Sequence, residues 1–146
     1  MIIRSPVPDL AIPENVSLPE FVLQHAKDLP NKPALIDGPS GRTITYAQLA
    51  GAVRMAAAGL ADRGFGKGDV FAIYSPNLPE YAIAFLAVAT LGGIVTTVNP
   101  LYTANELTHQ MKDAGAQYIL TVPPFLPNAF EAAKASVAAS LRNVVP

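Results

Sequence analysis

Two loops and two histidines are the parts of this sequence whose residue types could do chemistry. Gly64-Phe-Gly-Lys-Gly-Asp69 has the composition of a phosphate-binding loop, and Ser75-Pro-Asn-Leu-Pro-Glu80 separates a strand-like run from a helix-like one. His25 and His109 are the chain's two imidazoles. No Gly-x-Ser-x-Gly elbow, His-Glu-x-x-His pair or closely spaced pair of acids accompanies them. The interpretation of each therefore depends on the element that carries it.

The glycine-rich loop at 64–69 lies between a predicted helix and a predicted strand. Phosphate loops run the other way, from strand to helix, so that amides at the helix N-terminus face the anion. A glycine that ends a helix, followed by a tight turn, explains this segment without a ligand. We expect Gly64 to stop the preceding helix.

The segment Ser75–Glu80 runs in the direction that a ligand loop requires, at the carboxyl edge of a predicted sheet. Its chemistry suits phosphate poorly, because Pro76 and Pro79 each lack an amide donor. Glu80 also places a carboxylate in the first helical turn, where an anion would bind. The sequence favours a helix cap formed by Asn77 with Glu80, and a ligand site is the alternative.

Neither histidine has a partner at the spacing of a metal site or a catalytic triad. We expect His25 to pack at the boundary of an apolar helix face and His109 to be solvated. The charged pairs Lys112 with Asp113 and Glu131 with Lys134 are typical of solvated helix faces. The residues present do not assemble a catalytic site, so we nominate no catalytic, cofactor-binding or metal-binding residue.

The elements that would position these residues follow from apolar spacing and caps. An extended arm is expected over residues 1–16, and an α/β unit over residues 17–146. Predicted helices cover 18–29, 46–63, 78–91, 104–114 and 127–141, and predicted strands cover 33–37, 42–46, 70–74, 94–98, 118–122 and 143–146. Capping boxes at Ser17, Thr45 and Thr103 mark three helix starts. The first helix would carry the stripe Leu18, Phe21, Val22, His25 and Leu29, and the last would turn Phe130, Ala133, Val137 and Leu141 inward.

Strands that alternate with helices of this length predict right-handed crossovers and a mainly parallel sheet. The fold class is therefore α/β, with flanking helices and an N-terminal β-hairpin. The helix over 78–91 is apolar on all sides, so we expect cover on several of them. The final strand only begins at Asn143, so the sheet is expected to be incomplete, and an incomplete sheet predicts self-association of the isolated chain.

Composition excludes several functions. Ten Lys and Arg residues against eleven Asp and Glu residues give a net charge of −1, without the cationic cluster that a nucleic-acid partner needs. Apolar residues at 51% exclude intrinsic disorder. The absence of Cys excludes disulfides and thiolate metal sites. No secretory signal is visible, and the apolar stretch 82–98 is too short to span a membrane, so we expect a cytoplasmic protein.

Two motifs carry a resemblance to a known family. Ile44-Thr-Tyr-Ala-Gln-Leu49 resembles the first core motif of the adenylate-forming (AMP-binding) enzymes, and Leu91-Gly-Gly-Ile-Val-Thr-Thr-Val-Asn-Pro100 resembles the second. The likeness continues through 75–77, 79–81, 99–103, 106–107 and 113–116. Thr90-Leu91-Gly92 and Asn99-Pro100 favour acyl-CoA ligases similar to 4-coumarate and fatty acid ligases, since amino-acid-adenylating domains usually have Lys-Ala-Gly and Asp-Pro there.

The resemblance implies part of the large N-terminal domain of an ATP-dependent carboxylate-CoA ligase. In such enzymes a carboxylate attacks ATP to give an acyl-adenylate, and coenzyme A then displaces AMP, with Mg²⁺ offsetting phosphate charge. The family's phosphate loop and catalytic lysine have no matching position here and would follow residue 146. We therefore expect this chain to be inactive alone, to bind no cofactor and to need the remainder of a parent chain.

Both matched motifs imply structural roles in this chain. Tyr46 and Leu49 would seat the second helix, and Gly92 and Gly93 would permit a close reversal from helix to strand. Two alternatives stay open at the level of the sequence. The chain could be a self-contained α/β binding or interaction module, or a fragment of an amino-acid-adenylating domain.

Overall fold

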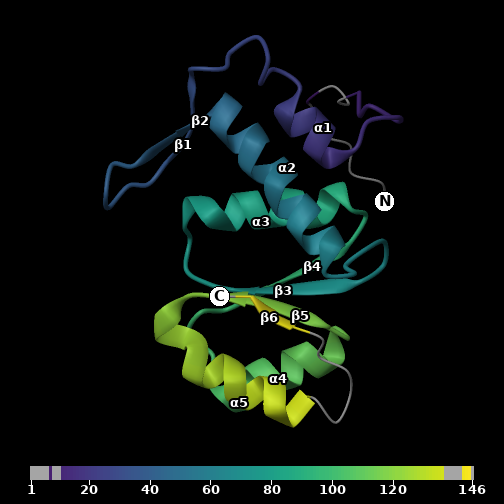
Figure 1. Cartoon of the computed structure of the whole chain (residues 1–146), viewed down its shortest axis with the longest axis vertical. Coiled ribbons are helices and arrows are strands. Elements are labelled where there is room, and N and C mark those ends of the chain that lie inside the picture. The colour runs from purple at the N-terminus through teal and green to yellow at the C-terminus, as the bar shows by residue number, and fades with distance from the viewer. Residues whose placement is uncertain (1–6, 8–10, 137–142, 146) are drawn as a thin grey trace.

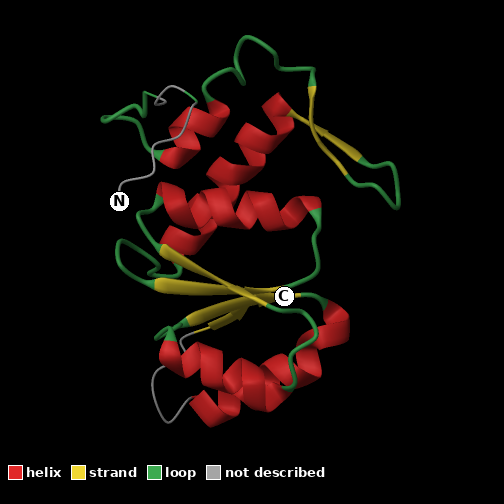
Figure 2. Ribbon diagram, turned by 180° about the vertical axis from the view of Figure 1, so that it is seen from behind, coloured by secondary structure: helices red, strands yellow, loops and turns green. Residues whose placement is uncertain are grey.

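The structure is a computed structural model that describes residue 7, residues 11–136 and residues 143–145. Within these residues, a sheet lies between two groups of helices (Figures 1 and 2). The helices are α1 (Leu18–Leu23), α2 (Tyr46–Asp62), α3 (Pro79–Thr90), α4 (Ala104–Asp113) and α5 (Leu126–Ser136), with a 3₁₀ turn, η1 (Pro123–Phe125), before the last. The strands are β1 (Pro33–Ile36), β2 (Thr43–Thr45), β3 (Val70–Tyr74), β4 (Ile94–Val98), β5 (Tyr118–Thr121) and β6 (Asn143–Val145).

The main sheet has the strand order β4-β3-β5-β6, and every pairing in it is parallel. Strands β1 and β2 pair antiparallel as a separate hairpin. The predicted α/β class, parallel sheet and N-terminal hairpin are therefore confirmed. Helices α1 to α3 lie on one side of the sheet and α4 and α5 on the other (Figure 1).

Strand β3 supplies the centre of both cores, because successive side chains point to opposite faces. Phe71 and Ile73 belong to the apolar cluster under α2 and α3, and Ala72 and Tyr74 belong to the cluster under α4 and α5. All four are at most 2% exposed. Because both faces of β3 are buried, its sequence is a continuous apolar run and does not alternate between apolar and polar residues.

Helix α3 lies between the sheet and α2, as its all-round apolar surface predicts. Ala87 and Val88 are fully buried in the cluster under α2, and Leu86 packs against Leu49 and Val53 of α2. This arrangement covers α3 on two sides.

Helix α2 follows the sequence pattern closely. Thr45 is its N-cap, and Gln48 closes the capping box by accepting from the Thr45 amide at 2.9 Å. The stripe Leu49, Val53, Ala57 and Leu60 is buried. Gly64 adopts a φ of 83° just after the helix, a conformation that glycine reaches without steric cost. The predicted cap, stripe and stop of this helix are confirmed.

Helix α1 is shorter than predicted and faces differently. It ends at Leu23, and hydrogen-bonded turns continue to Leu29 in place of the helix expected over 18–29. Pro19 and Ala26 are buried, whereas the predicted stripe is exposed, with Phe21 at 48%. The residues of the predicted stripe do recur at helical spacing, but α1 contacts α2 and α3 through Leu23 and not through that stripe.

Helix α5 is described from Leu126 to Ser136, so the expected inward residues Val137 and Leu141 lie outside the described residues. The prediction that Phe130 points inward is wrong, since this side chain is 49% exposed. Ala129 and Ala132 are buried instead. Small side chains permit the close approach of α5 to its neighbours, which a phenyl ring would prevent.

Candidate functional site

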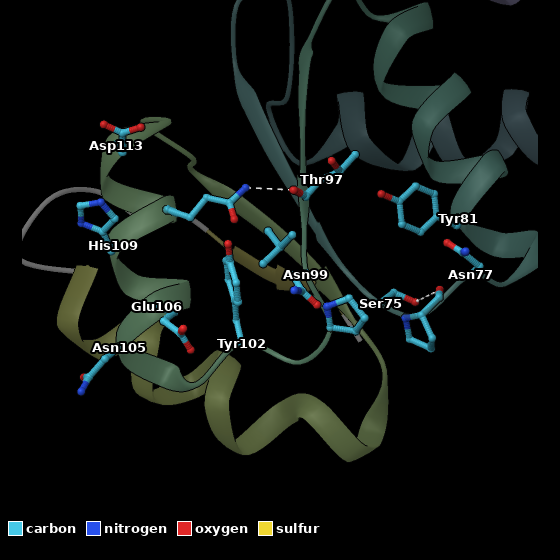
Figure 3. Close-up of a pocket in the computed structure, with 14 residues that line it drawn as sticks. Ser75, Asn77, Tyr81, Thr97, Asn99, Tyr102, Asn105, Glu106, His109 and Asp113 are labelled. Atoms are coloured by element: carbon cyan, nitrogen blue, oxygen red, sulfur yellow. Dashed lines mark hydrogen bonds between the residues drawn. The ribbon is translucent and has the colours of Figure 1, made fainter.

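A groove of about 1140 Å³ opens at the carboxyl ends of β3 and β4 (Figure 3). This is the edge of a parallel sheet where α/β proteins bind ligands. Its walls come from the loop after β3, the N-terminal part of α3, the loop after β4, and α4. The polar residues that line it are Ser75, Asn77, Tyr81, Thr97, Asn99, Tyr102, Asn105, Glu106, His109, Gln110 and Asp113.

The floor of the groove is a turn held by side chains from other elements. Asn99 Oδ1 accepts a hydrogen bond from Leu101 N at 3.0 Å, which fixes the chain immediately after β4. The buried Tyr74 hydroxyl donates to Tyr102 O at 2.8 Å, and Asn128 Nδ2 donates to both oxygens at 3.3 Å. Residues from β3 and α5 therefore fix the position of Tyr102.

The α4 wall is tied to the edge strand by one glutamine. Gln110 Nε2 donates to Thr97 O and to Thr96 Oγ1, each at 2.9 Å. Because β4 is the first strand in the sheet order, its outer peptide groups have no neighbouring strand among the described residues. The Gln110 amide covers part of that edge with a side chain.

Glu106 lines the groove but is engaged in the helix cap. Hydrogen bonds from the Thr103 amide at 2.9 Å and the Thr103 hydroxyl at 2.7 Å stabilise its ionised form. These two bonds hold the pKa of Glu106 below its ordinary value. The carboxylate is therefore a structural group and not a free acid or base.

The remaining charged groups of the groove are unsuited to a triphosphate. His109 is exposed, as predicted for it, and Asp113 lies on the same α4 wall (Figure 3). Among the residues that the structure describes, no Lys or Arg lines the groove, whereas the carboxylates of Glu106 and Asp113 do. Groups of three or more His, Cys, Asp or Glu that could hold a metal are absent among the residues that the structure describes.

The predicted cap formed by Asn77 with Glu80 is wrong. Leu78 is the N-cap of α3 and makes no side-chain cap bond, because Pro79 at the first helical position fixes where the helix begins. Asn77 instead lines the groove. Polar residues that follow the carboxyl ends of β3 and β4 are the sequence signal for the part of the groove that these two loops form.

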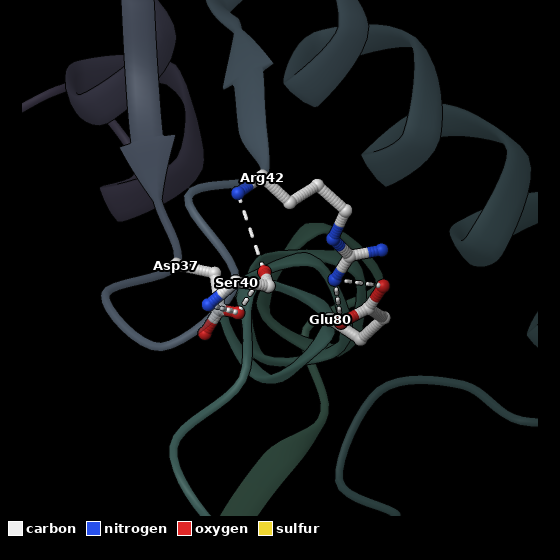
Figure 4. A network of polar contacts seen from close by, with 4 residues as sticks. All are labelled: Asp37, Ser40, Arg42 and Glu80. Atoms are coloured by element: carbon white, nitrogen blue, oxygen red, sulfur yellow. Dashed lines mark hydrogen bonds and ion pairs between the residues drawn. The ribbon is translucent and has the colours of Figure 1, made fainter.

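Glu80 bonds to the hairpin instead of capping α3 (Figure 4). Arg42 Nη2 lies 2.7 Å from the Glu80 carboxylate, with both side chains 51% exposed. The hairpin turn is shaped by Asp37, which accepts hydrogen bonds from the amide and hydroxyl of Ser40. The ion pair therefore fastens the end of the hairpin to the start of α3 and borders a smaller, mostly apolar pocket of about 410 Å³.

The two glycine segments have structural roles. Gly64 and Gly68 have positive φ, and Gly66 N donates to Asp69 Oδ2 at 2.9 Å, which gives the predicted stop and turn at 64–69. Gly92 has a φ of 70°, and Gly93 faces the ring of Phe65. The predicted close reversal after α3 is confirmed.

His25 is not packed at a boundary as predicted. Its side chain is 66% exposed, and Nδ1 lies 3.5 Å from Asp28 Oδ2, an exposed pair that contributes little to stability. The predicted helix ends at Leu23, so His25 lies in the turns after the helix and not on a helix face.

No helix in the described part of the chain is both long and apolar enough to cross a membrane.

The sequence has clear relatives. Residues 22–145 match the family model described as AMP-binding enzyme. The chain is 42% identical over 121 residues to 4-coumarate-CoA ligase 3 of Oryza sativa subsp. japonica, covering 83% of this chain and 22% of that protein. It is 40% identical over 124 residues to 4-coumarate-CoA ligase 4 of Arabidopsis thaliana, covering 82% and 22%. The chain thus spans about a fifth of the length of these relatives.

Solved structures share the fold. The anthranilate CoA ligase AuaEII in complex with anthranoyl-AMP aligns with a TM-score of 0.82 at 19% identity, covering 91% of this chain and 25% of that one. The N-terminal domain of FACL13 from Mycobacterium tuberculosis aligns with a TM-score of 0.74 at 25% identity, covering 79% and 29%. Both similarities extend over most of the described sheet and helices.

Proposed function

Because this chain belongs to the AMP-binding enzyme family, we propose that it forms the N-terminal part of an ATP-dependent carboxylate-CoA ligase. Residues 17–146 would be the first α/β portion of the AMP-binding domain, before the phosphate loop. The observation that carries the proposal is the 42% identity over 121 residues to a 4-coumarate-CoA ligase, inside a family match that spans 22–145. The parent reaction would join a carboxylate to coenzyme A at the cost of ATP.

The chemistry of the described groove supports inactivity of this chain in isolation. A triphosphate needs cations or free amides, and the described residues that line the groove include two carboxylates and no Lys or Arg. These residues do not fit ATP with Mg²⁺, so we assign no step of the reaction to them. Catalytic and nucleotide-binding groups would come from the remainder of the parent chain.

The acid used by the parent is proposed to be an aromatic propenoic acid such as 4-coumarate. Eight curated relatives at 35–42% identity carry that name. A fatty acid is the second candidate, from the sequence resemblance to fatty acid ligases. The two acids differ enough in shape that one assay separates them.

Isotope exchange between pyrophosphate and ATP tests the proposal, with 4-coumarate or a medium-chain fatty acid as the carboxylate. We expect exchange from a longer protein that contains this chain and none from the 146-residue chain above a heat-inactivated control. Exchange by the 146-residue chain itself would contradict its inactivity. A longer protein that exchanges with neither acid would contradict the ligase function.

Three further expectations stay predictions. A cytoplasmic location can be checked by cell fractionation, and Mg²⁺ dependence by adding a chelator to the exchange assay. Self-association of the isolated chain can be checked by sedimentation. A clean monomer at high protein concentration would contradict the expected self-association.

A further inference from the structure

A second pocket, of about 760 Å³, lies between α2 and the segment formed by α1 and the turns after it, on the side of the sheet that α1 to α3 cover (Figure 1). It reaches Thr90, the last residue of α3, whereas the groove at the carboxyl edge of the sheet includes Tyr81, near the start of that helix. The helical rise between these two residues is about 14 Å. The second pocket is therefore distinct from the candidate site described above.

Small side chains leave this pocket open. Ala47, Ala50 and Arg54 have the three- and four-residue spacing that places side chains on one face of a helix, and all three line the pocket. The facing wall includes Leu23, which is half-buried, and Ala26, which is buried. Alanine side chains are too short to close the space between the two walls. The floor is aliphatic, and no aromatic ring lines the pocket within the described residues.

Three charged side chains line the pocket, namely Glu20, Lys27 and Arg54. Lys27 and Arg54 are exposed, and neither forms an ion pair with another described residue. Glu20 is engaged in the helix cap, where it accepts hydrogen bonds from the Ser17 amide at 3.0 Å and the Ser17 hydroxyl at 2.7 Å. These bonds hold the pKa of Glu20 below its ordinary value, so the group is ionised at neutral pH. The lining therefore carries a net charge of one positive, which one carboxylate would neutralise.

The chemistry of the walls selects among anionic ligands. Lys and Arg hold carboxylates through charge-assisted hydrogen bonds. An alkyl chain gains free energy when it leaves water for an aliphatic floor. A phosphate dianion would exceed the positive charge of the lining, and an aromatic acid would find no ring against which to stack. A single carboxylate on an alkyl chain matches both the charge and the floor.

We propose that this pocket binds an aliphatic monocarboxylate of the fatty acid class. Lys27 and Arg54 hold the carboxylate, and the alkyl chain lies against Ala47 and Ala50. The inference goes beyond the proposed function and does not depend on it, because every residue of the pocket belongs to this chain and no step of the ligase reaction is assigned to them. The pocket binds the acid without activating it.

Titration with octanoate, followed by amide NMR of the 146-residue chain, tests the site. We expect saturable shifts of the Ala47 and Ala50 signals and no comparable shift of the Asn99 signal in the other groove. Ala50→Leu fills the pocket and should abolish the shift at Ala47. Ala58→Leu is the matched control, because Ala58 is an exposed residue of the same helix that does not line the pocket. Absence of saturable binding to the unmodified chain, or equal binding to the two leucine variants, would overturn the proposal.

The role of the two cations has its own test. Lys27→Gln and Arg54→Gln should each weaken octanoate binding about two- to five-fold, the effect of losing one exposed ion pair. Lys112→Gln is the control, since it removes an exposed lysine that does not line the pocket. Octylammonium, which has an alkyl chain and a positive charge, should bind more weakly than octanoate. Octylammonium or 4-coumarate binding as tightly as octanoate would overturn the proposal, as would unchanged affinity in both glutamine variants.

The same substitution separates this inference from the proposed function. In a longer protein that contains this chain, equilibrium dialysis counts the octanoate sites, and we expect Ala50→Leu to remove one of them. Pyrophosphate exchange by the unmodified longer protein, measured in parallel, reports on the ligase function alone. An unchanged number of octanoate sites in the Ala50→Leu protein would overturn the proposal, whether or not exchange is observed.

Discussion

A side chain at position 93 would collide with the ring of Phe65. A Cβ on Gly93 would lie 2.4 Å from Phe65 Cζ and 3.0 Å from Val88 Cγ1. The Phe65 ring is 3% exposed and packs edge-on against Phe71 and Tyr118, with centroids 5.7 and 5.1 Å apart. The ring therefore has no free space into which it could move.

Gly93→Leu is expected to lower the free energy of unfolding by about 1–3 kcal/mol, the usual range for an overpacked core. Gly51→Ala is the matched control, because a Cβ there meets nothing within 4 Å and the residue lies inside α2. That control should raise stability by about 0.5–1 kcal/mol. Urea denaturation measures both, and an unchanged midpoint for Gly93→Leu would refute the packing argument.

Tyr74→Phe should destabilise the chain by about 1 kcal/mol, because the buried hydroxyl donates to Tyr102 O. It should also speed amide exchange in the turn at 99–102, which that bond fixes. Tyr81→Phe is the control, since the Tyr81 hydroxyl has no hydrogen bond to another described residue. Equal effects of the two substitutions would show that the Tyr74 hydroxyl does not hold the turn.

The capping box of α4 predicts a pH dependence. The folded-state pKa of Glu106 is lowered by its bonds to Thr103, so its contribution to stability is complete above the ordinary carboxyl pKa. That contribution is lost as the pH falls through the lowered value. In Thr103→Ala, we expect the pKa of Glu106 to rise part of the way back, as measured by NMR titration. A pKa that does not move would exclude the hydroxyl as a cause.

The Arg42–Glu80 pair should contribute little to stability despite its 2.7 Å separation. Both side chains are half exposed, and such pairs are usually worth about 0.2–1 kcal/mol. A double-mutant cycle with Arg42→Gln and Glu80→Gln measures the coupling energy, which should shrink in concentrated salt. A coupling of several kcal/mol that salt leaves intact would show that the pair is effectively buried.

The sequence correctly predicted the elements for which several local signals, such as caps, apolar spacing and turn residues, agree with each other. Helix α2 has a capping box at Thr45, a regular apolar stripe and a glycine stop, so its start, buried face and end all follow from local rules. Strands β3 and β4 lie at their predicted bounds because their β-prone runs end at glycine- or proline-containing loops.

The errors occurred where tertiary packing overrides a local pattern. The apolar period through Phe21 and Val22 does predict a helix, but contact with α2 and α3 is made by the opposite face of α1. In α5, Ala129 and Ala132 pack inward and Phe130 is half exposed. The small size of alanine favours this arrangement, whereas hydrophobicity alone would place the phenyl ring inside. The groove was only partly foreseen, because residues from α4 and from the turn after β4 meet there through folding.

The alternation of Phe71, Ala72, Ile73 and Tyr74 along β3 leaves this strand a single tolerable alignment. Shifting the strand by one position would bring Tyr74 beneath α3 and Phe71 beneath α4. The Tyr74 hydroxyl would then be buried in the apolar cluster under α3, and the Phe71 ring would have to fit into a space that alanine fills. Insertions or deletions within 70–74 should therefore be far less acceptable than changes in the loops at either end.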